Sequence, residues 1–546
     1  MFVCRAIVAF LLAAWVLTGA ARAEPADLDA LVQDLGAGGF AQKQKAIDGL
    51  AATGDPAAVR SLEAMLDGKL YRRLSDGRVA IGAPSGQVIR LSDPLTGADL
   101  GDAAPADVDR VTINNRLRAG LRAALGGLTL LSPEPSVRRS AADAILKARP
   151  EGIEPLLRQA LTRESDDSVR AAMEQALAAV QLSSAPEPEI RIAALETLSQ
   201  AANQDVRALV AGLLVKDANG VPAEPDAGVR AAAETTLAAI ERRLAMWGIL
   251  GNLFHGLSLG SVLLLAAVGL AITFGVMGVI NMAHGEMVML GAYTTFIVQE
   301  WFRAHAPGAF DYSILVAVPM AFVVAGAVGV AIEQSVIRFL YGRPLETLLA
   351  TWGISLILQQ AVRSAFGPTN REVGAPSWMS GAIEVAGGLT LTYNRLWIIV
   401  FSLVVLALLM LLNRATDFGL TMRAVVQNRR MAASMGIRTG RIDALTFGLG
   451  SGIAGIAGVA LSQIDNVSPN LGQAYIIDSF MVVVFGGVGN LWGTLVGAMS
   501  LGLINKFLEP VAGAVLGKIL VLVGIILFIQ KRPRGLFALK GRAVEA

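Results

Sequence analysis

The chain reads FGVMGVINMAHGEMVMLGAY from Phe274 to Tyr293, and this stretch decides the fold. No Lys, Arg, Asp or Glu occurs from Leu244 to Gly285, and beyond Glu286 the sequence is apolar again to Val298. An uncharged run of this length is typical of a membrane-spanning helix rather than of a soluble core. The stretch therefore predicts membrane spans on both sides of Glu286.

A polar group interrupts these spans and consists of Asn281, His284 and Glu286. Polar side chains at membrane depth are costly, so they usually face protein, water or a substrate path. Asn281 and His284 fit the capping of a broken helix as well as they fit substrate contact. Glu286 fits a buried structural pair or a position at the cytoplasmic edge better than substrate contact. A later apolar segment holds the adjacent pair Gln359 and Gln360, of which only one can face inward on a helix. These five residues are the candidates for a substrate path.

Composition divides the chain into two parts. Of the 546 residues 54% are hydrophobic and only 16% are charged, whereas soluble domains average about 25% charged residues. The deficit lies in the second half, which predicts one soluble domain followed by one multi-span domain. The single cysteine, Cys4, lies at the N-terminus, so we expect no disulfide, thiol chemistry or cysteine-bound metal in the mature protein.

The N-terminal segment 1–23 has the pattern of a secretory signal peptide. It contains Arg5, an apolar run over 6–17 and the sequence Ala21-Arg22-Ala23, which is a basic start, a short apolar core and a small-residue cleavage site. An uncleaved membrane anchor is the alternative. The pattern predicts that residue 24 onward begins outside the cytoplasm.

A local unit recurs within residues 24–245. Each copy has an apolar residue, an adjacent arginine and a second apolar residue eight positions after the first, which places the apolar pair on one helical face. Stacked helices of this kind form an α-solenoid, here resembling short, degenerate HEAT-type repeats. We interpret the arginines as partners of acids in the neighbouring repeat, with direct ligand binding as the alternative. The arginines are Arg138, Arg170, Arg191 and Arg230.

Residues 66–107 interrupt this helical pattern. The segment contains the apolar runs 79–81 and 88–91, and turn residues at Asp76-Gly77 and Asp93-Pro94. Such runs between turn residues predict a small β-hairpin insert. The predicted fold class is thus all-α, apart from this insert. The first half of the sequence has no pattern for a metal site, a nucleophile triad or a phosphate loop, so we interpret it as an interaction surface.

The second domain, 246–540, is predicted to be a polytopic helical membrane domain of about nine spans. The glycines within 443–464 are spaced for close helix packing, with the lining of a pore as the alternative. Apolar stretches with few charged residues place the spans near 254–275, 280–299, 313–335, 347–366, 396–412, 443–464, 474–488, 491–507 and 511–530.

The loop charges predict the orientation of these spans. The loop 413–442 holds arginines at six positions against the single acid Asp417, and the tail 531–542 is also basic. Loops 300–312 and 367–394 are nearly balanced in charge. Basic loops are retained in the cytoplasm, so an odd number of spans entered from outside, with a cytoplasmic C-terminus, satisfies every loop.

The sequence lacks the phosphate loop G-x-x-x-x-G-K-[ST]; Gly513 to Ile519 fails in its spacing and its last residue. We therefore expect no ATP hydrolysis by that route. The basic loop contains a predicted amphipathic helix from Thr421 to Met435 that ends at Gly436. A separate motor subunit could push on such a helix, and a role restricted to membrane topology is an equal alternative.

Three separated motifs resemble one family. They are GVINMAHGEMVMLGAY at 278–293, MAASMGI at 431–437 and VFGGVGNLWGTLVGA at 484–498, and they resemble LivH-type permeases of branched-chain amino-acid ABC transporters over about 250–540. The N-terminal repeat domain, with TLLATWGISLILQQ at 347–360 and FGPTN at 366–370, resembles the layout of urea ABC transporter permeases within this group.

The resemblance implies a multi-pass protein of the bacterial inner membrane, in contact with lipid. It implies a second permease subunit, two ATPase subunits that use ATP, and an extracytoplasmic substrate-binding protein, without nucleic acid. This chain is expected to bind no cofactor and not to be an enzyme. The loop 413–442 would dock an ATPase. Its candidate residues are Arg423, Arg429, Arg430, Ala432 and Gly436; the last two match the Ala and Gly of the permease EAA loop, whose Glu is missing here.

Several functions stay open at this stage. The leading hypothesis is a permease subunit of an ATP-driven urea importer that works by alternating access. Branched-chain amino acids or short amides are alternative cargoes. The charged termini of an amino acid favour buried ionic partners, however, and the candidate path has few of them. A passive channel needs no docking loop, and an ion-coupled carrier would show more paired acids within the membrane. A membrane-anchored interaction protein would not need nine spans.

Overall fold

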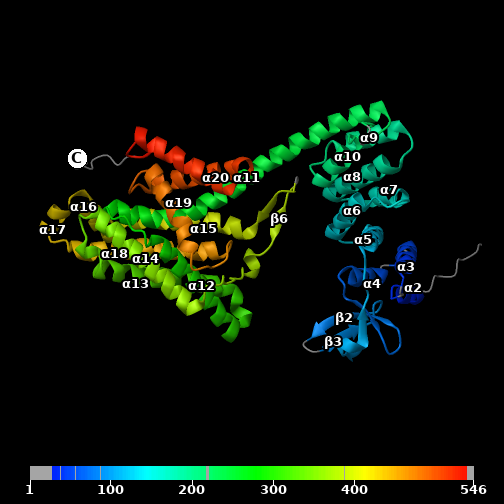
Figure 1. Ribbon diagram of the computed structural model, residues 1–546, viewed down its shortest axis with the longest axis horizontal. Helices are drawn as coiled ribbons and strands as arrows, with labels where there is room; N and C mark the ends of the chain where they lie inside the picture. Colours follow the sequence, from blue (N-terminus) through cyan, green and yellow to red (C-terminus); the bar gives the residue numbers. More distant parts are fainter. Residues whose placement is uncertain are drawn as a thin grey trace, which may run out of the picture. The chain divides into compact units, whose positions relative to one another are not determined.

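The computed structural model describes residues 28–36, 39–53, 55, 57–85, 88–216, 220–385 and 388–537. The predicted signal peptide 1–23, Cys4 and the tail beyond 537 lie outside these residues. The chain forms two compact units, Met1–Leu244 and Ala245–Ala546, and Figure 1 follows the sequence through both.

Unit 1 begins with helices α2 (Leu28–Asp34), α3 (Phe40–Thr53) and α4 (Ala57–Leu66) and continues into a β-sheet. The five strands are antiparallel in the order β4-β3-β2-β1-β5. The structure corrects two predictions. The insert is a five-stranded sheet rather than a hairpin, and the fold class is not all-α, although the chain is mostly helical. The strands are β1 (Leu70–Arg73), β2 (Val79–Ser85), β3 (Val88–Ser92), β4 (Asp99–Ala103) and β5 (Val108–Arg110).

Three strands, β1, β4 and β5, escaped the prediction, and the last two did so because their sequences are short and polar. Strand β4 reads DLGDA and β5 reads VDR after the short helix η1 (Pro105–Asp107), so neither shows the alternation that marks a half-buried strand. Tertiary pairing with β3 and β1 supplies what the local sequence lacks.

The remaining helices of unit 1 pack in sequence order. Helix α6 packs on α5 and on α8, and α8 packs on α9 (Figure 1). In each copy of the recurring unit one apolar position is buried in a shared core, namely Ile145, Val169, Leu198 and Val229, whereas Ile190 is 40% exposed. The solenoid classification stays a prediction. The helices are α5 (Asn115–Thr129), α6 (Pro135–Ala148), α7 (Glu154–Arg163), α8 (Asp167–Ser184), α9 (Pro188–Leu198), α10 (Gln204–Leu213) and the first part of α11 (Ala227–Met277).

The arginines of the recurring unit converge on two glutamates, each of which lies between two of these arginines in the sequence. Arg138 Nε donates to the Glu164 carboxylate at 2.6 Å, and Arg170 donates to the backbone oxygen of the same glutamate. The Glu164 side chain is only 1% exposed, and its hydrogen bond with Arg138 lowers the pKa of the carboxyl to about 2. The arginines therefore act as structural partners. The second instance comprises Arg191, Arg230 and Glu224.

Unit 2 is a helical bundle. Six of the described helices are long and apolar enough to cross a membrane. Two more, α12 (His284–His305) and α19 (Leu471–Gly486), belong to the bundle without meeting those limits, so the count of nine spans stays a prediction. The six are α11, the segment Pro307–Phe339 with η2 (Pro307–Tyr312), α13 (Ser313–Ser335) and η3 (Ile337–Phe339), α14 (Pro344–Phe366), α15 (Tyr393–Ala415), α18 (Thr439–Ser462) and α20 (Leu491–Lys531).

Helix α20 reverses its direction at Gly513, whose φ of 77° is non-helical. Its first arm runs antiparallel to α19, because successive residues of this arm contact earlier and earlier residues of α19. Its second arm runs parallel to α19, because successive residues of this arm contact later and later residues of α19. The two arms coincide with the predicted segments 491–507 and 511–530. The contacts are Gly493 with Gly486, Gly497 with Val482, Lys518 with Asp478 and Phe528 with Phe485.

Helices α12, α13 and α18 approach one another closely. A Cβ atom on Gly291 of α12 would overlap the carbonyl group of Gly455 in α18, and one on Gly455 would meet the carbonyl oxygen of Ala321 in α13. Small residues permit such backbone contact between membrane helices. The glycines of α18 therefore serve packing, as predicted.

The predicted helix Thr421–Met435 is in fact two helices, α16 (Asp417–Gln427) and α17 (Arg429–Ser434). Asn428 between them has extended backbone angles, and its side chain accepts a hydrogen bond from Met431 N. Asparagine is a favoured N-cap residue, so it ends one helix and starts the next. Elsewhere, η4 (Ser377–Met379) and a hairpin of β6 (Ala382–Glu384) and β7 (Thr390–Thr392) join α14 to α15.

Candidate functional site

The candidate path begins at a break between two helices. Helix α11 ends at Met277 and α12 begins at His284, with the non-helical residues 278–283 between them. His284 Nε2 lies 2.9 Å from the backbone oxygen of Ala266, so the chain turns back and α12 starts beside the middle of the apolar part of α11. Non-helical backbone at membrane depth is tolerated only where it is buried in protein or lines a water-filled cavity.

Hydrogen bonds compensate the backbone of this break. Met282 N donates to the Thr351 hydroxyl of α14 at 3.1 Å, and Ala283 N donates to Asn281 Oδ1 at 3.0 Å. Asn281 is 1% exposed, and its Nδ2 has no hydrogen-bond partner among the described residues. Asn281 thus caps the break with one end of its amide and leaves a buried donor at the other.

Glu286 lies in the first turn of α12 and faces α14. Its Oε1 accepts hydrogen bonds from Ser355 Oγ at 2.9 Å and from Gln359 Nε2 at 2.7 Å. Its side chain is 1% exposed, it forms no ion pair among the described residues, and its Oε2 has no hydrogen-bond partner there. A buried carboxylate oxygen without a donor is an uncommon and costly feature.

The structure brings four of the five predicted path residues into the interior. Asn281, His284, Glu286 and Gln359 are buried, and Glu286 contacts Gln359 directly. Gln360 is exposed, and its side chain contacts Ser364 of its own helix at 3.5 Å. As expected for adjacent residues, only one of the two glutamines faces inward.

The sequence reasoning missed two residues of this cluster, Thr351 and Ser355. With Gln359 they recur every four residues along α14 and therefore share one helical face. All three are buried. That spacing within an apolar segment was the available signal, because a polar stripe in a membrane helix marks its protein-facing side.

The predicted coupling residues are dispersed over α16, α17 and the following turn. Arg423 donates to the backbone oxygen of Asn413, and Arg429 forms an ion pair with Asp443 of α18. Ala432 is buried and Gly436 has a φ of 90°. Arg430 is exposed and forms no ion pair among the described residues.

Exposed apolar side chains accompany Arg430. Met431 and Met435 are 60% and 77% exposed and recur at helical spacing. Leu420 of α16 is also 60% exposed. Methionine adapts its shape to a partner surface. We call the group Arg430, Met431 and Met435 the loop surface; its apolar members were missed in the sequence.

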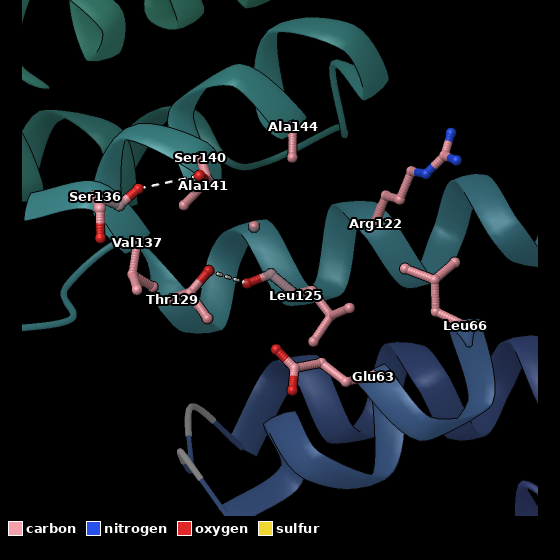
Figure 2. A pocket seen from close by; sticks show the side chains of 11 residues that line it. Glu63, Leu66, Arg122, Leu125, Thr129, Ser136, Val137, Ser140, Ala141 and Ala144 are labelled. Atoms are coloured by element: carbon pink, nitrogen blue, oxygen red, sulfur yellow. Dashed lines mark hydrogen bonds between the residues drawn. The ribbon is translucent and has the colours of Figure 1, made fainter. Parts of the chain in front are cut away.

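Unit 1 contains a shallow pocket of about 360 Å³ between α4, α5 and α6 (Figure 2). Its hydroxyl groups are already engaged, because Thr129 donates to the Leu125 oxygen and Ser140 to the Ser136 oxygen. The charged side chains that line it, Glu63 and Arg122, are exposed. No predicted site residue lies in this pocket.

Comparison with known proteins places unit 2 in a family. The family described as the permease component of branched-chain amino acid transport systems matches residues 252–529. The high-affinity branched-chain amino acid transport permease LivH of Salmonella typhimurium is 34% identical over 264 residues, which cover 46% of this chain and 83% of LivH.

Two further relatives match a similar share of the chain. The high-affinity branched-chain amino acid transport permease BraD of Pseudomonas aeruginosa is 30% identical over 293 residues, covering 53% of this chain and 95% of BraD. The ribose import permease RbsC of Escherichia coli is 26% identical over 270 residues, covering 48% and 78%. The chain therefore belongs to the family of branched-chain amino acid transport system permease components, with an additional unit ahead of the matched residues.

Proposed function

We propose that this chain is the permease subunit of an ATP-driven importer of urea that works by alternating access. Membership in the permease family carries the importer class. The relatives are transport permeases by name, and such a subunit depends on separate ATPase subunits. The proposed complex has a second permease subunit, two ATPase subunits and an extracytoplasmic substrate-binding protein.

The buried cluster supports a small, neutral cargo. Asn281 Nδ2 is a donor and Glu286 Oε2 an acceptor, each without a partner among the described residues. Urea has one carbonyl acceptor and two amino donors, so it complements both groups. Gln359 and Ser355 fix the other carboxylate oxygen, which leaves Oε2 oriented for a ligand.

Branched-chain amino acids are the second candidate cargo, and the names of LivH and BraD favour them. An amino acid carries a carboxylate as well as an ammonium group, and a buried charge needs a paired partner. Glu286 could pair with the ammonium group. The cluster of Asn281, Glu286, Ser355 and Gln359 offers no cation for the carboxylate, which is why we place urea first.

The loop surface is the proposed docking site for an ATPase subunit. Met431 and Met435 supply exposed apolar contacts and Arg430 an exposed charge. Interfaces are enriched in methionine and arginine. In this proposal unit 1 lies outside the cytoplasm and contacts the substrate-binding protein, whereas the loop surface lies inside.

Uptake of labelled urea at micromolar concentration tests the proposal, with and without this chain in cells that retain its partner subunits. Unlabelled leucine serves as the competitor, and ATP depletion is a parallel arm. We expect uptake that requires the chain and ATP and that leucine does not reduce. Competition by leucine would move the cargo to amino acids. Uptake that survives ATP depletion would contradict the importer class.

A further inference from the structure

Helix α17 has few attachments to the rest of unit 2. It is six residues long, and only Ala432 among its residues is buried. Its first residue, Arg429, forms an ion pair with Asp443 of α18 through both terminal guanidinium nitrogens. Asp443 is fully buried, whereas the Arg429 side chain is 41% exposed. The guanidinium group therefore reaches from the loop surface into the bundle.

A second contact extends this connection to another helix. The Arg429 guanidinium lies over the Tyr341 ring at 4.6 Å from its centroid, a cation–π geometry. The Tyr341 hydroxyl donates to Glu333 Oε1 at 2.8 Å, and Glu333 is buried at the end of α13. Burial raises the pKa of Tyr341, so the phenol stays neutral and keeps its proton for this hydrogen bond.

The connection joins α17 to two helices that themselves pack tightly. Helices α13 and α18 share close backbone contacts through Gly455 and Ala321. Asp443 is in the first turns of α18, and Glu333 is near the end of α13. One arginine on α17 is thus connected to the N-terminal turns of α18 and, through Tyr341, to the C-terminal end of α13.

We propose that Arg429 is a positioning residue for transport: held by Asp443 and Tyr341, it transmits movement of α17 to α18 and α13. The inference rests on the proposed function. It refines that function by giving Arg429, which the sequence analysis had placed among the docking residues, a role inside the subunit. Its contacts with Asp443 and Tyr341 couple the proposed docking surface to the membrane helices.

The coupling ratio tests this role. The complete complex, with its ATPase subunits and binding protein, is reconstituted in proteoliposomes, and substrate uptake per ATP hydrolysed is measured. For Arg429→Ala we expect hydrolysis within about twofold of the unmodified complex and a drop of about tenfold in uptake per ATP. Arg429→Lys keeps the charge and should recover part of the ratio. Lys531→Ala, which removes an exposed charge at the end of α20, should leave it unchanged.

A purely structural role would give a different result. Uptake and hydrolysis would then fall together, in proportion to the amount of assembled complex, and their ratio would stay constant. That outcome, or an unchanged ratio with full activity, would overturn the proposal. Asp443→Asn changes the other partner of the Arg429–Asp443 ion pair. It should lower the uptake per ATP hydrolysed in the same way as Arg429→Ala.

A measurement without transport separates this proposal from the proposed function. Amide hydrogen exchange of the intact chain in detergent reports the attachment of α17 directly. We expect Arg429→Ala to accelerate exchange in 429–434 and to leave α16 unchanged. Unaltered exchange would overturn the anchoring role whatever the cargo is. Failure of the unmodified complex to transport urea or leucine would instead contradict the proposed function. The anchoring role of Arg429 would then be judged from the hydrogen-exchange result alone.

Discussion

At the scale of single residues, the unusual feature of unit 2 is a carboxylate with one satisfied and one unsatisfied oxygen. Glu286 Oε1 accepts two hydrogen bonds from α14, whereas Oε2 is buried without a partner among the described residues. A purely structural carboxylate would use both oxygens, because an unmade hydrogen bond in the interior is expensive. A ligand that donates to Oε2 removes this cost.

Glu286→Gln tests that interpretation with little change of shape. The amide oxygen can keep the bonds from Ser355 and Gln359, while an amino group replaces the acceptor Oε2. Hydrogen bonds to charged groups contribute about 1.5–3 kcal/mol, so we expect uptake at low substrate concentration to fall by about tenfold or more. Concentration-dependent uptake would measure this as a raised KM. Gln360→Ala is the control, since Gln360 is exposed. Equal uptake by both variants would exclude Glu286 from the path.

The Glu164 carboxylate predicts a pH dependence in unit 1. Its folded-state pKa of about 2 lies below the ordinary value of 4.5 because Arg138 holds it ionised. The contribution to stability is therefore present above pH 4.5 and is lost as the pH falls toward the folded value. In the intact chain, Glu164→Gln should accelerate amide exchange in α6 near neutral pH, and the difference from the unmodified chain should shrink below about pH 4.

The control for this pH experiment is Glu174→Gln on α8. Glu174 is exposed and forms no ion pair among the described residues. Its replacement should change exchange little at any pH. A Glu164→Gln effect of the same size at every pH would show that packing, rather than the charge, is responsible.

At the scale of helices, the backbone contact between α12 and α18 is the most demanding feature. A methyl group on Gly291 would overlap the carbonyl of Gly455, and overpacking of a core costs about 1–3 kcal/mol. Gly291→Ala should therefore lower the thermal unfolding midpoint of the purified chain in detergent. Gly353→Ala is the matched control, because nothing lies within 4 Å of a Cβ there. A midpoint that is the same for both variants would contradict the contact.

Long apolar segments were readable from the sequence, and interruptions governed by single side chains were not. The polar group that interrupts the apolar run marked the break between α11 and α12. The break at Asn428 was missed because the amphipathic pattern continues across it while the side chain caps a new helix. Strand β4 was missed because its stability comes from pairing with β3 rather than from its own residues.

The candidate site shows the same division. Burial of Asn281 and Glu286 follows from their place in an apolar run, and the sequence suffices for it. The partner of Glu286 lies 73 positions away on α14, a distance that periodicity does not span. Arg429 was assigned to docking because it is basic and in a loop; its carboxylate partner on α18 becomes evident only in three dimensions.

At the scale of the whole molecule, the distribution of loop charges predicts the orientation in the membrane. Cysteine labelling tests it, because Cys4 is the only native cysteine. In a Cys4→Ser background, Ala382→Cys in β6 should react with a membrane-impermeant maleimide added to intact cells. Ser434→Cys in α17 should react only after permeabilisation. Both positions are exposed, so they form a matched pair.

The opposite labelling pattern would invert the predicted topology. The loop surface would then lie outside the cell, beyond the reach of an ATPase. Labelling of both positions in intact cells would contradict an arrangement with the two loops on opposite sides of the membrane. The chain should be expressed without its partner subunits, so that a docked subunit does not shield Ser434.

The glycine contacts of α12 and α18 have a mechanical consequence. Two helices in backbone contact cannot slide or roll past each other without a clash, whereas helices separated by long side chains can. Together with α13, they therefore form a stiff frame. Helix α14 is mostly exposed outside its polar stripe and meets α12 of this frame through that stripe and through Val362 and Phe366, which pack with Tyr293. We expect the hinge-like element of the transport cycle to be α14, swinging against a frame that keeps its shape.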